Sequence, residues 1–180
     1  WDLSQRLRGQ CGSEAAMPAF WPAGSKVVLM TGAVAQIDLS PGARGLERTW
    51  RIGAADRGFD DPDVVERRLA FDGIGLRPYA VAHLRAQPAA AGTRLHWVRR
   101  TRIDGDSWVS TEVPLGEERE AYLLRVRRGA VFLHEVEVTA PDWTYPAALR
   151  AADGPAAVTV EVAQLSARFG AGPFRSVTLA

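Results

Sequence analysis

Three histidines are the side chains best suited to acid–base chemistry or metal binding, but their context favours neither. His96 alternates out of phase with Trp97, and His134 adjoins Glu135, so both are predicted to face solvent or an interface. Neither a His-x-His pair nor a zinc-protease helix motif is present, and the third histidine is His83. Because Cys11 is the only cysteine, a cysteine-based zinc cluster and an internal disulfide are both excluded. We predict no catalytic residue, no bound metal and no cofactor.

Two groups of aspartates carry oxygens that calcium prefers. One is Asp104-Gly-Asp-Ser-Trp108, and the other comprises Asp56, Asp60, Asp61 and Asp63. Neither has the glycine and terminal glutamate of an EF-hand loop at the required offsets. Turns whose Asp side chains bond to backbone amides are a more common use of such residues, and calcium binding stays an alternative.

Two short basic runs suggest nucleic-acid binding at first sight. They comprise Arg99, Arg100 and Arg102, then Arg125, Arg127 and Arg128, and Glu117, Glu118 and Glu120 lie between them. The formal net charge of the chain is only +1. Alternating charge is typical of exposed strand faces, so we predict no nucleic-acid partner.

Aromatic side chains are the best candidates for ligand contacts, because an exposed ring can stack on a sugar or anchor an interface. Trp108 follows an acidic turn, and Trp143 and Tyr145 lie in a segment bounded by Pro141 and Pro146. We therefore name Trp108, Trp143 and Tyr145 as candidate ligand-binding residues. Burial of either tryptophan under a loop is the alternative. There is no nucleophile elbow, phosphate-binding loop or catalytic triad context, so we predict that the protein is not an enzyme.

The elements that position these residues are strands. Leu95 and Trp97 share one face of a predicted strand, and Tyr122, Leu124 and Val126 share one face of another. Residues 158–162 repeat the alternation, and residues 177–179 end the chain after a glycine-containing turn. Helical spacing never persists for three turns, so the chain is predicted to be all-β.

The first 75 residues have a different texture. Strands are predicted at 27–30, 37–39 and 46–52, with Leu46, Trp50 and Ile52 on one face, and a single helical turn is an alternative for residues 64–69. These strands predict a small β-barrel or sheet domain over residues 1–75, which is followed by a second β domain over 76–180. With 180 residues of which 47% are hydrophobic, the chain has enough apolar material for a core. It shows no membrane-spanning run, and its start indicates a fragment of a longer protein.

Residues 76–180 resemble a fibronectin type III domain, which implies a β-sandwich. Pro78 precedes the first strand, Trp97 matches the tryptophan of the second strand, and Tyr122 matches the aromatic residue of the third. Val158 departs from the family, because it stands where a tyrosine usually makes the corner hydrogen bond. Residues 104–117 resemble an insertion.

A second resemblance covers nearly the whole chain and rests on several motifs. These are Leu7-Arg-Gly-Gln-Cys-Gly-Ser-Glu14, Arg44-Gly-Leu46, Trp97-Val-Arg-Arg-Thr-Arg102, Gly105-Asp-Ser-Trp108, Val113-Pro-Leu-Gly-Glu-Glu118 and Val162-Ala-Gln164. Together they resemble the carboxy-terminal region of the large tail-tip hub, or baseplate, protein of gene transfer agents and siphophage-like prophages.

That resemblance implies a structural virion component at the tail tip that links the tail to host-recognition parts and contacts the cell surface. It implies other tail-tip proteins as partners, a homotrimer in the full-length protein, and assembly in the cytoplasm, without membrane insertion. The alternative function is a carbohydrate-binding module acting on capsule or lipopolysaccharide, with a cell-surface glycan as partner. An enzyme that degrades envelope polymers ranks third.

Overall fold

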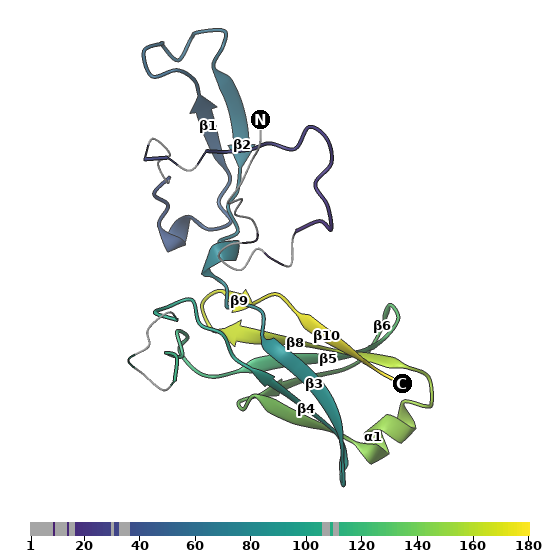
Figure 1. Ribbon diagram of the computed structural model, residues 1–180. Coiled ribbons are helices and arrows are strands. Elements are labelled where there is room, and N and C mark those ends of the chain that lie inside the picture. Colours follow the sequence, from purple (N-terminus) through teal and green to yellow (C-terminus); the bar gives the residue numbers. More distant parts are fainter. Residues whose placement is uncertain are drawn as a thin grey trace. The chain divides into compact units, whose positions relative to one another are not determined.

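The computed structural model describes residues 9, 14, 17–29, 31–32, 37–105, 109 and 112–180 (Figure 1). The chain divides into two compact units. One spans residues 20–74, and the other spans residues 75–180 together with the described residues before 20. Each unit is described by itself below.

The described chain is built almost entirely of strands. Its elements are the 3₁₀ turn η2 (Pro41–Ala43), β1 (Arg48–Ile52), β2 (Val65–Leu69), the 3₁₀ turn η3 (Ile74–Leu76), β3 (Ala82–Ala89), β4 (Gly92–Val98), β5 (Tyr122–Arg128), β6 (Val131–Val138), β7 (Asp142–Pro146), α1 (Ala147–Ala152), β8 (Val158–Ser166), β9 (Gly170–Ala171) and β10 (Arg175–Leu179). The prediction of an all-β protein is confirmed.

The unit of residues 75–180 is a sandwich of two antiparallel sheets (Figure 1). One sheet has the order β3-β4-β7, and the other has the order β10-β8-β5-β6, with β9 paired to the end of β8. The chain crosses from one sheet to the other between β4 and β5, between β6 and β7, and between α1 and β8. This arrangement of three and four strands is the fibronectin type III-like sandwich that the sequence predicts.

Alternation along the strands builds the core of this sandwich. Leu95 and Trp97 of β4 face Tyr122, Leu124 and Val126 of β5, and all five side chains are buried. The rings of Trp97 and Tyr122 meet edge to face with their centroids 5.1 Å apart, a favourable aromatic geometry. These residues are the predicted core-marking positions, and the structure confirms them as core.

Within 20–74, the described residues form one sheet, the antiparallel pair β1–β2. The predicted strand at 46–52 forms as β1, with Trp50 and Ile52 on one face. The helical turn considered for residues 64–69 is wrong, because that segment pairs with β1 as the strand β2. The strands predicted near residues 27 and 37 are also wrong: the described residues 27–29 and 37–39 have no regular structure.

Candidate functional site

Two of the three predicted ligand-binding residues lie in β7, and the third, Trp108, lies outside the described residues. Trp143 and Tyr145 are two positions apart, so both side chains lie on the inner face of the three-stranded sheet. Their rings stack with centroids 5.4 Å apart and planes 20° apart. Tyr145 is completely buried, whereas Trp143 is half-buried at the edge of the core. Of these two residues, only Trp143 is therefore accessible to a ligand.

The phenol of Tyr145 ends in a polar cluster that the sequence did not indicate. Its hydroxyl donates to the carboxylate of Asp153, and Nε2 of His134 lies 2.8 Å from both oxygens of the same carboxylate. His134 belongs to β6 of the four-stranded sheet, and Tyr145 belongs to β7 of the other sheet. The three side chains, which we call the edge clasp, therefore bridge the two sheets.

Local sequence explains how Asp153 reaches this place. Residues 147–152 read Ala-Ala-Leu-Arg-Ala-Ala, a run of strong helix formers, and they form the short helix α1 directly after β7. Gly154 follows with φ of 84°, a conformation that suits glycine and ends the helix. Asp153 is the C-cap residue, and its backbone N–H donates to helix carbonyls. The helix thus carries the carboxylate back over the end of β7.

Each group of the edge clasp alters its neighbour's protonation. The hydrogen bond from Tyr145 is the largest influence on Asp153, and with the bond and charge of His134 it holds the carboxyl pKa below its usual value despite burial. Burial, followed by the bond to Asp153, raises the pKa of the Tyr145 hydroxyl to about 12. The clasp therefore stays as a neutral phenol and a carboxylate across a wide pH range.

His134 differs from its predicted setting. It is predicted to face solvent or an interface, whereas its ring is half-buried against Asp153 and meets Tyr145 edge to face. The reason is its strand parity: His134 lies opposite Val126, on the same inward face as Val136 and Val138. That alternation was a usable signal in the sequence, but the identity of the partner, Asp153, was not.

The composition of the edge clasp suits a structural role, that of holding the two sheets together. Its single carboxylate already accepts bonds from a phenol and an imidazole, and its one hydroxyl, that of Tyr145, is fully buried with its pKa raised to about 12, which makes it a poor nucleophile. Next to the edge clasp lies the ring of Trp143, which is stacked on Tyr145 and is only half-buried. Stacking of an apolar or sugar face on that ring is the contact that this geometry offers.

Several of the acidic and basic groups singled out in the sequence have partners within the protein, while Asp106 lies outside the described residues. Arg57 pairs with Asp61 and Asp63 in the loop between β1 and β2. Of the basic runs, Arg102 pairs with Glu117 and Arg125 with Glu135. Across the part of the chain that the structure describes, no three metal-ligating side chains gather as a metal would need, and no helix is long and apolar enough to cross a membrane.

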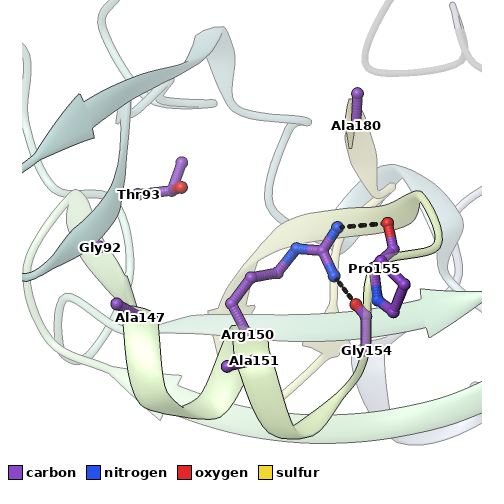
Figure 2. Close-up of a pocket in the computed structure, with 8 residues that line it drawn as sticks. All are labelled: Gly92, Thr93, Ala147, Arg150, Ala151, Gly154, Pro155 and Ala180. Carbon is purple, nitrogen blue, oxygen red and sulfur yellow. Dashed lines mark hydrogen bonds between the residues drawn. The ribbon is translucent and has the colours of Figure 1, made fainter.

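A hollow of about 630 Å³ lies beside α1, as Figure 2 shows. Small residues line most of it, including Gly92, Ala147 and Ala151. Its one charged side chain, Arg150, turns its guanidinium toward the carbonyls of Gly154, Pro155 and Ala156. Because these N–H groups already donate to the backbone that ends the helix, the guanidinium of Arg150 is not free to bind an anion in the hollow.

Comparisons with known proteins add little to this geometry. No protein-family model and no curated protein matches the chain. Among solved structures, it is similar to domains d3-d4 of the rat CD45 extracellular region, at 9% sequence identity and a TM-score of 0.40. The alignment covers 99% of this chain and 85% of that chain. A superposition this loose carries no argument about function, and the fold rests on the strand order above.

Proposed function

We propose that this chain is a structural module of a phage-like tail tip or baseplate hub. In this role it links the tail to host-recognition parts and works by presenting surfaces rather than by turning over a substrate. The motifs that resemble tail-tip hub proteins of gene transfer agents and prophages motivate the proposal. The sandwich supports it, because paired sheets make a rigid spacer whose end loops are left to vary.

The observation that carries the proposal is the exposure of apolar side chains in residues 20–74. Among the described residues of this unit only Ala43 is buried, while large apolar side chains stay exposed. Phe20, Leu29 and Phe59 each have more than 70% of their surface exposed. Monomeric proteins rarely expose so much apolar surface, and an isolated two-stranded sheet is marginal in water. Such a segment is expected of a subunit that completes its packing in a larger assembly.

The proposal includes its partners and place. The module works in the particle at the tail tip after assembly in the cytoplasm, beside other tail-tip proteins and as part of a homotrimer of the full-length protein. Contact with the cell surface comes through the sandwich loops, and neither nucleic acid nor membrane insertion is part of this function.

Electron microscopy of released particles tests this directly. An antibody raised against these 180 residues and coupled to gold is expected to label the tail tip of particles from cells that carry the gene. Particles without label, together with the protein recovered only in other fractions, would refute the tail-tip function. Serum from before immunisation is the control.

The half-buried ring of Trp143 supports a second candidate, a carbohydrate-binding module acting on capsule or lipopolysaccharide. Stacking on one aromatic ring is worth up to about 1.5 kcal/mol, so Trp143→Ala is expected to weaken glycan binding roughly tenfold. Phe132→Ala is the matched control, because Phe132 is 49% exposed on the outer face of the other sheet. No measurable affinity of the unaltered protein for polysaccharide of the source cell would exclude this function.

A further inference from the structure

The β1–β2 ribbon has two unlike faces. Its register pairs Arg48 with Leu69, Trp50 with Arg67, and Ile52 with Val65. Directly opposed residues in an antiparallel pair share a face, so these six side chains form one surface, which we call the ribbon face. The other face carries Thr49, Arg51, Glu66 and Arg68, and there Arg51 and Glu66 form an ion pair of 3.5 Å.

The ribbon face carries Ile52 and Val65 at one end, Leu69 at the other and Trp50 beside Arg67 in the middle, and its aliphatic side chains are left uncovered. Ile52 is 57% exposed, and Val65 and Leu69 are each 42% exposed. Trp50 is half-buried and meets the ring of Phe71 edge to face, with centroids 5.8 Å apart. Tryptophan and arginine beside aliphatic residues are the composition of protein-interface cores.

The charge on the ribbon face has one sign. Arg48 and Arg67 lie on it, none of its six residues is acidic, and neither arginine forms an ion pair with a described carboxylate. Arg67 reaches only the backbone carbonyl of Glu66. A partner that covers this face must therefore bring negative charge, because two guanidinium groups desolvated without counter-charges are costly.

The edges of the ribbon narrow the choice of partner. Within the described residues, β1 and β2 pair only with each other, so the outer edge of each strand presents backbone N–H and C=O groups without strand partners. A lipid headgroup or a nucleic-acid phosphate cannot continue such a ladder, whereas an extended peptide can. The aliphatic residues of the face also suit apolar side chains better than phosphates.

We propose that the ribbon binds an extended acidic segment of a partner protein, which adds as a third strand along the outer edge of β2. There its apolar side chains adjoin Val65 and Leu69, and a carboxylate between them meets Arg67. This inference does not depend on the tail-tip function, and its test needs no particle, so either can fail alone.

The test uses the full chain labelled with ¹⁵N and two synthetic peptides of about ten residues, a common strand length. In one peptide, valine and glutamate take turns at every second residue with threonine between them, so that both side-chain types can lie on the ribbon face; the other peptide has lysine in place of glutamate. The glutamate peptide is expected to shift the amide resonances of β1 and β2, to slow hydrogen exchange at one outer edge, and to bind more weakly as salt rises. The lysine peptide is expected to leave the ribbon unchanged.

Two neighbouring arginines of β2 supply matched variants. Arg67→Glu reverses a charge on the ribbon face, whereas Arg68→Glu reverses one on the opposite face. We expect Arg67→Glu to weaken binding at least about tenfold and Arg68→Glu to change it less than about threefold. Both substitutions are on the exposed surface, and unchanged β1 and β2 resonances in the free variants verify that the ribbon is intact.

Four results would overturn the inference. The first is failure of the glutamate peptide to bind, the second is equal binding of the lysine peptide, and the third is equal effects of the two variants. The fourth is concentration-dependent shifts of the ribbon resonances in the protein alone, with a dimer or trimer in sedimentation, because a second copy would then be the occupant.

Discussion

Removing one hydroxyl from the edge clasp tests whether it braces the sandwich. Tyr145→Phe keeps the buried ring and its stack on Trp143 but deletes the hydrogen bond donated to Asp153. The substitution adds no atoms and leaves no large cavity. Its effect on the free energy of unfolding therefore reports the bond rather than the packing.

The structure sets the size of the expected effect. A hydrogen bond to a charged acceptor contributes about 1.5–3 kcal/mol to stability. The carboxylate of Asp153 is 10% exposed and keeps its contact with His134 at 2.8 Å, so the vacated oxygen can bind water in part. We expect Tyr145→Phe to lower the free energy of unfolding by about 1.5–2 kcal/mol at neutral pH.

The effect should also depend on pH with a defined sign. The pKa of Asp153 is lowered in the folded protein, so the unfolded chain binds a proton more readily and acid favours unfolding. The stability that Asp153 contributes is complete above its unfolded pKa of about 4 and is lost as the pH falls through the lower folded value. Since Tyr145 is the largest cause of that lowering, the difference between the two proteins should shrink below about pH 4.

Urea unfolding of the full chain, monitored by the amide resonances of β5 and β8, measures the free energy of unfolding of the sandwich. Tyr79→Phe is the control: an arginine lies over the Tyr79 ring, but no described residue hydrogen-bonds its hydroxyl. We expect that control to stay within about 0.5 kcal/mol. The stabilising role of the edge clasp would be refuted if Tyr145→Phe lowered the free energy of unfolding no more than this control does. It would also be refuted if the loss persisted unchanged in acid.

Three further substitutions probe the sandwich, each by the same urea measurement. Both polar atoms of the buried Gln164 side chain lack a hydrogen-bond partner among the described residues, so Gln164→Met should stabilise by about 1 kcal/mol; destabilisation would show that the amide is satisfied. A Cβ at Gly172 would lie 2.3 Å from the carbonyl oxygen of Pro78, so Gly172→Ala should cost about 1–3 kcal/mol. Gly75→Ala, which meets open space, should be neutral, and equal costs would contradict the contact. Leu124 is fully buried, and Leu124→Ala should cost about 2–5 kcal/mol, while a loss below about 1 kcal/mol would place it outside the core.

The alternation of inward-facing and outward-facing residues in the sequence was sufficient to predict which side chains form the sandwich core. A strand with period two assigns each side chain to a face without knowledge of its partner, so Leu95, Trp97 and Tyr122 could be placed inside from residue order alone. The same rule failed at residues 64–69, because a short mixed run suits a helical turn or a strand equally well. Pairing with β1 decided that segment, and pairing is a property of the tertiary structure.

The edge clasp and the ribbon face show what residue order could not determine. No pattern in the sequence singled out Asp153. In the structure, α1 places its carboxylate against His134 and Tyr145, which come from opposite sheets. The sequence showed that Trp50 and Ile52 share a face, but only the register with β2 placed Arg67 beside them. Sequence periodicity determines which way a side chain points within its own strand. Which side chains meet depends on how separate strands pair and pack, and only the tertiary structure decides that.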